Sequence, residues 1–213
     1  MMSTINKKKK VCFVTHDYSF FKSNLSHFSI EISEIHDITV ITDAQNITNK
    51  DLTFLKENNI TLRHLDQRPN SNRLKTIKYI YALKKIVQNV APEYIFYTTV
   101  EMAFFGSLIT KFKTARKSFF VITGIGLDFF SKRLRHKILN LIYFITFKLN
   151  KFKQNTSYIF QNYEDQHQFL KAGYIGSNDS TVIGHFGITL ANAKDAKKES
   201  TDFINFFFAG RLV

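Results

Sequence analysis

The sequence VCFVT at residues 11–15 is a nearly continuous apolar run that follows four consecutive lysines and ends at His16 and Asp17. A run without polar alternation is typical of a strand that is buried on both faces of a parallel sheet. A secretory signal would need about 7–15 apolar residues after the basic stretch, and this run is shorter. We therefore predict that the chain opens with a buried strand and not with a signal peptide.

Strand-like runs alternate with helical segments along the following chain. Apolar side chains recur at spacings of three and four over residues 25–35, which predicts one helix with an apolar stripe. The same spacing predicts an amphipathic helix over residues 73–90, whose apolar groups lie on one side and come from Leu74, Ile77, Ile80, Tyr81, Leu83, Lys84 and Val87. This order predicts an α/β fold with a doubly wound, Rossmann-like parallel sheet. The other predicted strands are residues 38–41, 60–65, 94–98, 118–123, 156–161 and 181–184.

Composition limits the class of protein. The 213 residues include 30 Lys and Arg against 17 Asp and Glu, which gives a formal net charge of +13, and 44% of them are hydrophobic. This hydrophobic content excludes a wholly disordered chain. The single cysteine excludes a disulfide scaffold, and because no histidine has metal-ligand spacing we expect no metal site. No stretch approaches the roughly 20 apolar residues of a spanning helix, so we predict a cytoplasmic chain.

Histidines follow two of the predicted strands. Ligands of parallel sheets bind beyond the carboxyl ends of the strands, which makes the residues there the candidates for chemistry. His16 and Asp17 follow the first strand and His185 follows a late one. Each histidine could orient a sugar hydroxyl or transfer a proton, or could simply be exposed.

The sequence TGIGLD at residues 123–128 follows a predicted strand and precedes a helix. Gly124 and Gly126 would let backbone amides approach a ligand, and the helix N-terminus favours phosphate or carboxylate. A tight turn without a ligand is at least as good an interpretation of two glycines. The motif lacks the third glycine of the dinucleotide fingerprint and no GxxxxGKS/T loop is present, which disfavours nicotinamide-binding and P-loop classes.

Residues 129–163 contain no Asp or Glu, and their apolar centre at residues 138–147 is flanked by basic side chains. This pattern is typical of a segment that lies on an anionic lipid surface, and equally of a long helix packed on the sheet with a solvated basic rim. No nucleic-acid-binding module is visible, so we predict no nucleic-acid partner. The candidate membrane-surface residues are Lys132, Arg133, Arg135, Lys137, Lys148, Lys151 and Lys153.

Several short motifs, taken in order, resemble family 4 glycosyltransferases of the GT-B fold, in a branch that assembles bacterial surface polysaccharide. TGIG is similar to the "TGLG" loop of that branch, FQNYED to its "FQNxDD", and FAGRLV to the "ivGRLl" that opens a second domain. The order and spacing of the motifs are more specific than any one of them. The matching segments are residues 10–15, 91–95, 123–126, 160–165, 182–190 and 208–213.

The resemblance implies a retaining transferase that moves a sugar from a nucleotide donor, usually UDP-linked, to an acceptor, without a metal or other cofactor. Residues 1–190 would form the acceptor-side Rossmann-like domain, residues 191–202 a linker, and residues 203–213 the first strand of a donor-binding domain. The lysine and the acidic motif of the donor site have no counterpart in the sequence. The resemblance therefore predicts an incomplete donor site and little or no transfer by this chain alone.

The same resemblance implies roles for the candidate residues, although it names no catalytic base. The acceptor would be a lipid-linked or glycan molecule at the inner face of the cell membrane, where the enzyme would bind peripherally to anionic lipid. Two alternatives stay open: an enzyme similar to UDP-N-acetylglucosamine 2-epimerases, and a basic module that binds membranes or nucleic acid without catalysis. The expected acceptor-binding residues are His16, Asp17, Gly124, Gly126, Asp128 and His185, and the expected donor diphosphate-binding residues are Gly210 and Arg211.

Overall fold

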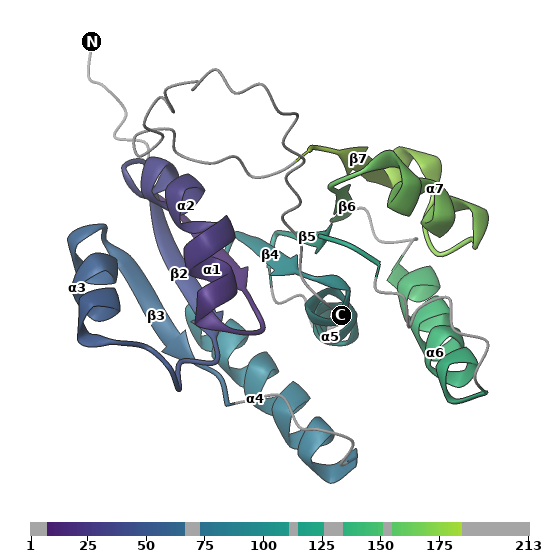
Figure 1. Cartoon of the computed structure of the whole chain (residues 1–213), viewed down its shortest axis with the longest axis horizontal. Helices are drawn as coiled ribbons and strands as arrows, with labels where there is room; N and C mark the ends of the chain where they lie inside the picture. The colour runs from purple at the N-terminus through teal and green to yellow at the C-terminus, as the bar shows by residue number, and fades with distance from the viewer. Residues whose placement is uncertain (1–7, 67–72, 111–114, 126–133, 151–154, 185–213) are drawn as a thin grey trace, which may run out of the picture.

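The computed structural model describes residues 8–66, 73–110, 115–125, 134–150 and 155–184. They form a seven-stranded parallel sheet in the order β3-β2-β1-β4-β5-β6-β7, with helices on both faces (Figure 1). This confirms the predicted α/β fold, and each predicted strand is present with its ends within two residues of the prediction. The strands are β1 Lys9–Val14, β2 His36–Thr42, β3 Ile60–His64, β4 Tyr94–Thr98, β5 Lys117–Ile122, β6 Thr156–Phe160 and β7 Ser180–Val182.

The strand order reverses at β1, which pairs with β2 on one side and with β4 on the other. Because the crossovers between parallel strands are right-handed, the helices before the reversal and those after it cover opposite faces of the sheet. One core joins the first strands to α1, α2 and α3, and the other joins the sheet to α4–α7. The helices are α1 Tyr18–Asn24, α2 Ser26–Ser33, α3 Asn49–Glu57, α4 Arg73–Val90, α5 Val100–Ile109, α6 Leu134–Asn150 and α7 Tyr163–Lys171.

α5 lies between α4 and α6 and has no exposed residue (Figure 1). Gly106 lies directly against the ring of Tyr97, where a Cβ atom would clash with the ring. The missing side chain therefore lets α5 approach the sheet closely. In the same helical layer, α4 packs on one side of α5 and α6 packs on the other.

The helix predicted over residues 25–35 is present as α2, and a separate helix, α1, precedes it. Leu25, whose φ of −122° is not helical, lies between the two. The predicted apolar stripe is buried only in part, because Leu25 is fully buried but Phe28 and Ile35 are exposed, whereas the serines of α2 are buried. The Ser26 hydroxyl donates to the carbonyl of Lys22 at 2.6 Å, which satisfies it within the helical turn. The Ser33 hydroxyl likewise donates to the Ile30 carbonyl at 2.7 Å. These small side chains therefore let α2 pack closely on the sheet.

The bounds predicted for α4 are confirmed, but its predicted apolar side is only partly the packed one. Leu83 and Val87 of the predicted set are buried, together with Tyr79. Leu74, Ile77 and Tyr81 are exposed to 72%, 64% and 66%. Apolar residues occupy both sides of this helix, so their spacing alone could not tell the packed side from the outer one.

Candidate functional site

The loop after β1 places His16 and Asp17 at the carboxyl end of the sheet. Thr15 is buried, and its hydroxyl donates to Oγ1 of Thr42 at 2.8 Å, which joins the ends of β1 and β2. The Asp17 carboxylate caps α1 by accepting from the Phe20 backbone N–H at 2.7 Å. Its other oxygen lies 2.5 Å from Nε2 of His16, and both side chains are partly exposed. The carboxylate therefore orients the imidazole as well as beginning the helix.

The end of β4 carries a strained residue that the sequence analysis missed. Thr99 has φ 82° and ψ 151°, a region that residues other than glycine rarely adopt. Its backbone N–H donates to the carbonyl of Val121 in β5 at 2.9 Å, and its hydroxyl caps α5 by accepting from the Met102 N–H at 3.3 Å. A threonine before a helix predicts the cap, but nothing in the sequence predicts the strain.

The loop after β5 is linked to the start of α7. One oxygen of the Asp165 carboxylate accepts from the Ile125 N–H at 3.3 Å and from the side-chain amide of Asn162 at 2.9 Å. Asn162 in turn caps α7 by accepting from the Asp165 N–H at 2.7 Å. Gly124 has a φ of 158°, and a Cβ atom there would meet no other atom within 4 Å, so its loop faces open space. Of the described loop residues, Ile125 already uses its amide within the protein, whereas Gly124 is open to a ligand.

Strand β3 ends in a second histidine, His64, which the sequence analysis did not single out. Nδ1 of His64 accepts from the Ala44 N–H at 3.1 Å, and its Nε2 lies 3.2 Å from Oδ1 of Asp66. These contacts join the loops after β2 and β3. They lie two strands away from β4, so we treat them as support for the loops and not as part of the reacting site.

The structure thus brings part of the predicted site together. His16, Thr99 and Gly124 follow β1, β4 and β5, which are neighbours in the sheet. This is the point where the strand order reverses, where open α/β sheets bind ligands. The other predicted acceptor and donor residues, Gly126, Asp128, His185, Gly210 and Arg211, lie outside the described residues, as do Lys132, Arg133, Lys151, Lys153 and the side chains of Arg135 and Lys137.

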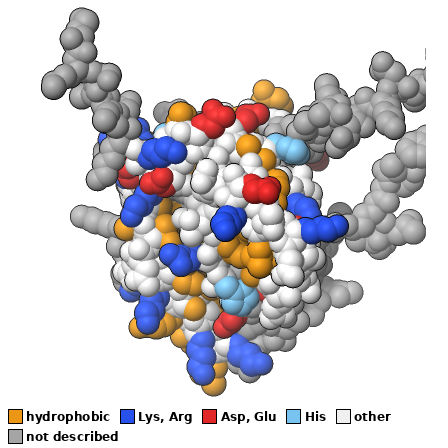
Figure 2. All heavy atoms as spheres, turned by 90° about the vertical axis from the view of Figure 1, so that its left-hand side faces the viewer, with side chains coloured by type: hydrophobic (Ala, Val, Ile, Leu, Met, Phe, Trp, Pro, Cys, Tyr) orange, Lys and Arg blue, Asp and Glu red, His pale blue; other side chains and the backbone are white. Residues whose placement is uncertain are grey.

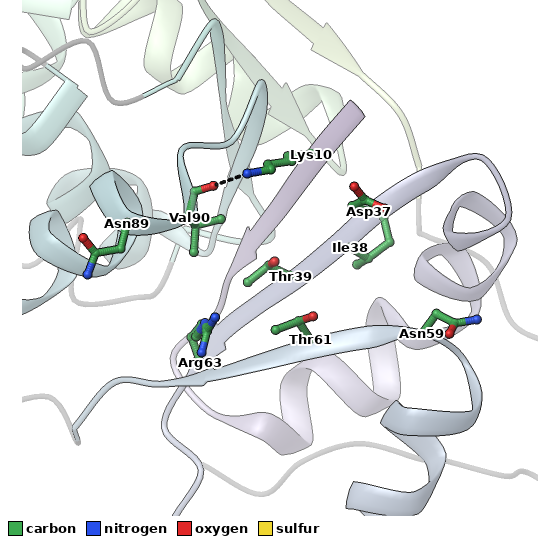
Figure 3. A pocket seen from close by; sticks show the side chains of 9 residues that line it. All are labelled: Lys10, Asp37, Ile38, Thr39, Asn59, Thr61, Arg63, Asn89 and Val90. Atoms are coloured by element: carbon green, nitrogen blue, oxygen red, sulfur yellow. Dashed lines mark hydrogen bonds between the residues drawn. The ribbon is translucent and has the colours of Figure 1, made fainter. Parts of the chain in front are cut away.

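A polar hollow of about 330 Å³ lies elsewhere, on the face of β1–β3 beside the end of α4 (Figure 3). Thr39 and Thr61 are register partners on adjacent strands, and both contribute side chains to it. The Lys10 side chain turns toward α4, where Nζ donates to the Val90 carbonyl at 3.5 Å. The residues from β1 and β2 come from the first half of each strand, so the hollow is distinct from the carboxyl-end site.

The surroundings of Cys12 disfavour nucleophilic chemistry at its thiol. Cys12 is fully buried in β1, and burial raises the pKa of its thiol well above the usual range. Within the described ranges, no three His, Cys, Asp or Glu side chains lie close enough to hold a metal ion. Among these residues, the His16–Asp17 pair and the backbone at Gly124 are therefore the groups that the carboxyl-end site offers to a ligand, and Thr99 lies between them in the sheet order.

The fold and the position of these loops define a Rossmann-like α/β domain whose candidate site lies at the strand reversal. Residues 10–162 match the family model described as glycosyl transferase 4-like, and the chain belongs to this family. No curated protein sequence matches the chain significantly. In the described part of the chain, no helix has both the length and the apolar character that crossing a bilayer requires.

Two solved structures share the fold. A glycosyltransferase from Rickettsia africae superposes with a TM-score of 0.53 at 14% identity, covering 84% of this chain and 43% of that one. The Anabaena protein HepE, in complex with UDP and glucose, superposes with a TM-score of 0.55 at 15% identity, covering 83% of this chain and 44% of that one. The chain therefore spans less than half the length of either protein.

Proposed function

We propose that this chain is the acceptor-side part of a retaining glycosyltransferase, which moves a sugar from a nucleotide-sugar donor to a lipid-linked or glycan acceptor in surface-polysaccharide assembly. The observation that carries the proposal is the family match over residues 10–162, which includes the loops after β1, β4 and β5. The same match favours a transferase over an epimerase. The UDP and glucose bound to the similar HepE fold support a UDP-linked donor.

The site can contribute acceptor binding and proton handling. In the transfer, the bond between the sugar C1 and the donor diphosphate breaks, a bond from C1 to an acceptor oxygen forms, and the proton of the acceptor hydroxyl passes to the departing diphosphate. The imidazole of His16, oriented by Asp17, is a hydrogen-bond partner for an acceptor hydroxyl. The open backbone at Gly124 leaves room for a sugar ring or a phosphate beside the loop. No metal is required in this proposal, because Arg211 and a helix N-terminus would stabilise the departing diphosphate.

The proposed acceptor is carried at a membrane surface. Lys148 is exposed on α6, and its Nζ lies 5.0 Å from the centre of the Phe144 ring, so the ammonium is held beside an aromatic group at the protein surface. This arrangement is suited to the interface between anionic headgroups and the apolar part of a bilayer. The enzyme would act there as a peripheral protein on the cytoplasmic face.

Mapping of amide chemical shifts tests the proposed site directly. A sugar attached to a short polyprenyl diphosphate is titrated into the chain, and UDP-glucose is titrated separately. We expect the acceptor analogue to shift the signals of His16, Thr99 and Gly124, with little change at the hollow around Thr39 and Thr61. The proposal would be contradicted if the acceptor analogue shifted none of the signals of His16, Thr99 and Gly124, or if it shifted only signals around Thr39 and Thr61.

A second set of samples, with UDP-N-acetylglucosamine as the nucleotide sugar, distinguishes the epimerase alternative. The nucleotide sugar is recovered after incubation with the chain and the acceptor analogue, and its stereochemistry is determined by NMR. Conversion of UDP-N-acetylglucosamine to its C2 epimer would assign the chain to the alternative class, whereas an unchanged donor sugar agrees with the proposed one.

A further inference from the structure

The outer side of α4 carries an apolar stripe that the packing of the sheet does not use. Leu74, Ile77 and Tyr81 are spaced three and four residues apart, and they point away from the buried residues Tyr79 and Leu83. Large apolar side chains in such a row are costly to expose to water. A stripe of this length on one helix therefore indicates a binding surface.

The same helix is strongly basic. α4 contains five Lys and Arg and no Asp or Glu over its 18 residues. Lys78 and Lys85 are exposed beside the apolar stripe. Figure 2 shows Lys and Arg side chains beside apolar ones toward the lower end of the molecule, which is where α4 begins in Figure 1. The helix thus combines an apolar row with flanking positive charge.

α6 has a corresponding surface on the other side of α5. Leu141, Ile142, Ile145 and Leu149 are exposed to between 44% and 56%, whereas Phe147 on the same helix is fully buried. Both helices pack on the same face of the sheet, with α5 between them and with no exposed residue of its own. The two apolar stripes therefore lie on the outer side of one helical layer.

We propose that the outer faces of α4 and α6 form one surface that docks on an anionic lipid bilayer. The apolar stripes enter the interface between headgroups and acyl chains, and the flanking lysines bind lipid phosphates. A second copy of the chain is a poorer occupant, because two surfaces that both carry a large excess of positive charge repel each other. The inference rests on the membrane part of the proposed function and adds α4, which that proposal does not include.

Fluorescence tests whether α4 enters the bilayer. The chain contains no tryptophan, so a Tyr81→Trp substitution provides a single reporter on the stripe. We expect its emission to shift to the blue, and to be quenched by brominated acyl chains, with vesicles of phosphatidylglycerol in phosphatidylcholine. A Leu52→Trp substitution on α3, whose side chain is exposed on the opposite face of the sheet, is the matched control and should not respond. An emission that is already blue-shifted without vesicles, or that the vesicles leave unchanged, would overturn the inference.

Vesicle sedimentation of the full chain tests the energetics. Lys78→Gln together with Lys85→Gln should weaken binding to anionic vesicles by about 10- to 30-fold, since each lysine near the surface contributes about fivefold. The same change at Lys50 and Lys56 on α3 should weaken it far less. Leu74→Ser with Ile77→Ser should weaken binding more than about tenfold, also in salt that screens the charges.

The possible outcomes separate the two proposals. If the lysine substitutions on α3 weakened vesicle binding as much as those on α4, α4 would not be part of the docking surface. Loss of a dimer on Leu74→Ser, measured by analytical ultracentrifugation without lipid, would assign the face to a second copy and overturn the lipid inference. Neither result would change the acceptor-induced shifts at Thr99 and Gly124, so a failure of this inference and a failure of the proposed function are distinguishable.

Discussion

The two halves of the sheet reach the same layered architecture through different contacts. In the half that contains β4–β7, the core is built largely from aromatic rings: the ring of Phe147 in α6 lies within 6.5 Å, centre to centre, of the rings of Phe120, Tyr143, Tyr158, Phe169 and Tyr174. In the half that contains β1–β3, α2 packs through serines and α1 is linked to α3 by a charge pair. We therefore expect the aromatic cluster to contribute more stability from burial than the smaller apolar core of the first half, to which serines and a charge pair add polar contacts.

The two halves also differ on the face of the sheet against which α1, α2 and α3 pack. α1, α2 and α3 cover the strands of the first half, and a hollow of about 180 Å³ remains between α2 and the strands of the second half. Phe28 on α2 and Phe96 on β4 line it, and Phe96 stacks on Phe119 with ring centres 4.5 Å apart. The candidate site lies at β1, β4 and β5, on the border between the two halves. It therefore depends on both kinds of packing.

Truncation of one fully buried phenylalanine in each half should have the largest effect. Phe147→Ala removes a ring with five aromatic neighbours, and Phe21→Ala removes one from the core of the first half. We expect losses of about 4–5 and about 3 kcal/mol in the free energy of unfolding, because the cost of a cavity grows with the contacts it removes. Urea unfolding measures both values. An equal or larger loss at Phe21 would show that the aromatic cluster does not dominate the stability.

The ion pair of the first half should produce a smaller effect that depends on pH. The Asp51 carboxylate accepts from Lys22 Nζ at 2.7 Å and from the Thr48 hydroxyl at 2.7 Å. The hydrogen bonds from Lys22 and Thr48 lower the pKa of Asp51 to about 2. Because this pKa lies below the value of about 3.9 in unfolded chains, the pair stabilises the fold at neutral pH. That contribution is lost as the pH falls from about 4 through about 2.

Asp51→Asn should therefore cost about 1–2 kcal/mol at pH 7 and much less at pH 2. The measurement is the free energy of unfolding at several pH values, with Asp43→Asn as a matched control on an exposed turn of the same half. The Asp43 side chain accepts from the nearby Gln45 N–H at 3.0 Å, a local contact within the turn, so its removal should cost less. A cost at Asp51 that does not change with pH would exclude the charge pair as its source.

The sequence was sufficient for the sheet because each buried strand is a short apolar run bounded by polar residues. It also placed the candidate loops after β1 and β5, since the carboxyl ends of parallel strands share one edge. It failed where a helix has apolar residues on two sides, as at Tyr81, or buries its serines, as at Ser29. In both helices the packed side is chosen by the neighbouring elements, which the spacing of apolar residues does not describe.

The candidate site, like the fold, could be predicted from the sequence only in part. His16 and Gly124 could be predicted, because their residue types and positions after strands carry a signal. The conformation of Thr99 could not, since it is imposed by the hydrogen bond to β5 and not by the local sequence. The Asn162–Asp165 pair had a readable signal, a capping residue followed three positions later by a carboxylate. Only the structure shows that this carboxylate also binds the loop after β5.

The smallest expected effect is a local one at this loop. Asp165→Ala removes the acceptor for the Ile125 N–H and should cost about 0.5–1 kcal/mol in global stability. Hydrogen exchange should show faster exchange of the Ile125 amide, while core amides such as that of Phe120 change only by the global amount. Glu164→Ala, at the exposed neighbouring position, is the control for charge at the start of α7. If the Ile125 amide exchanged at an unchanged rate, Asp165 would be a helix cap alone. If it exchanged faster, the glycine loop would be fixed to the aromatic half of the sheet, whereas the His16 loop is fixed to the polar half, and the two sides of the site would respond to different substitutions.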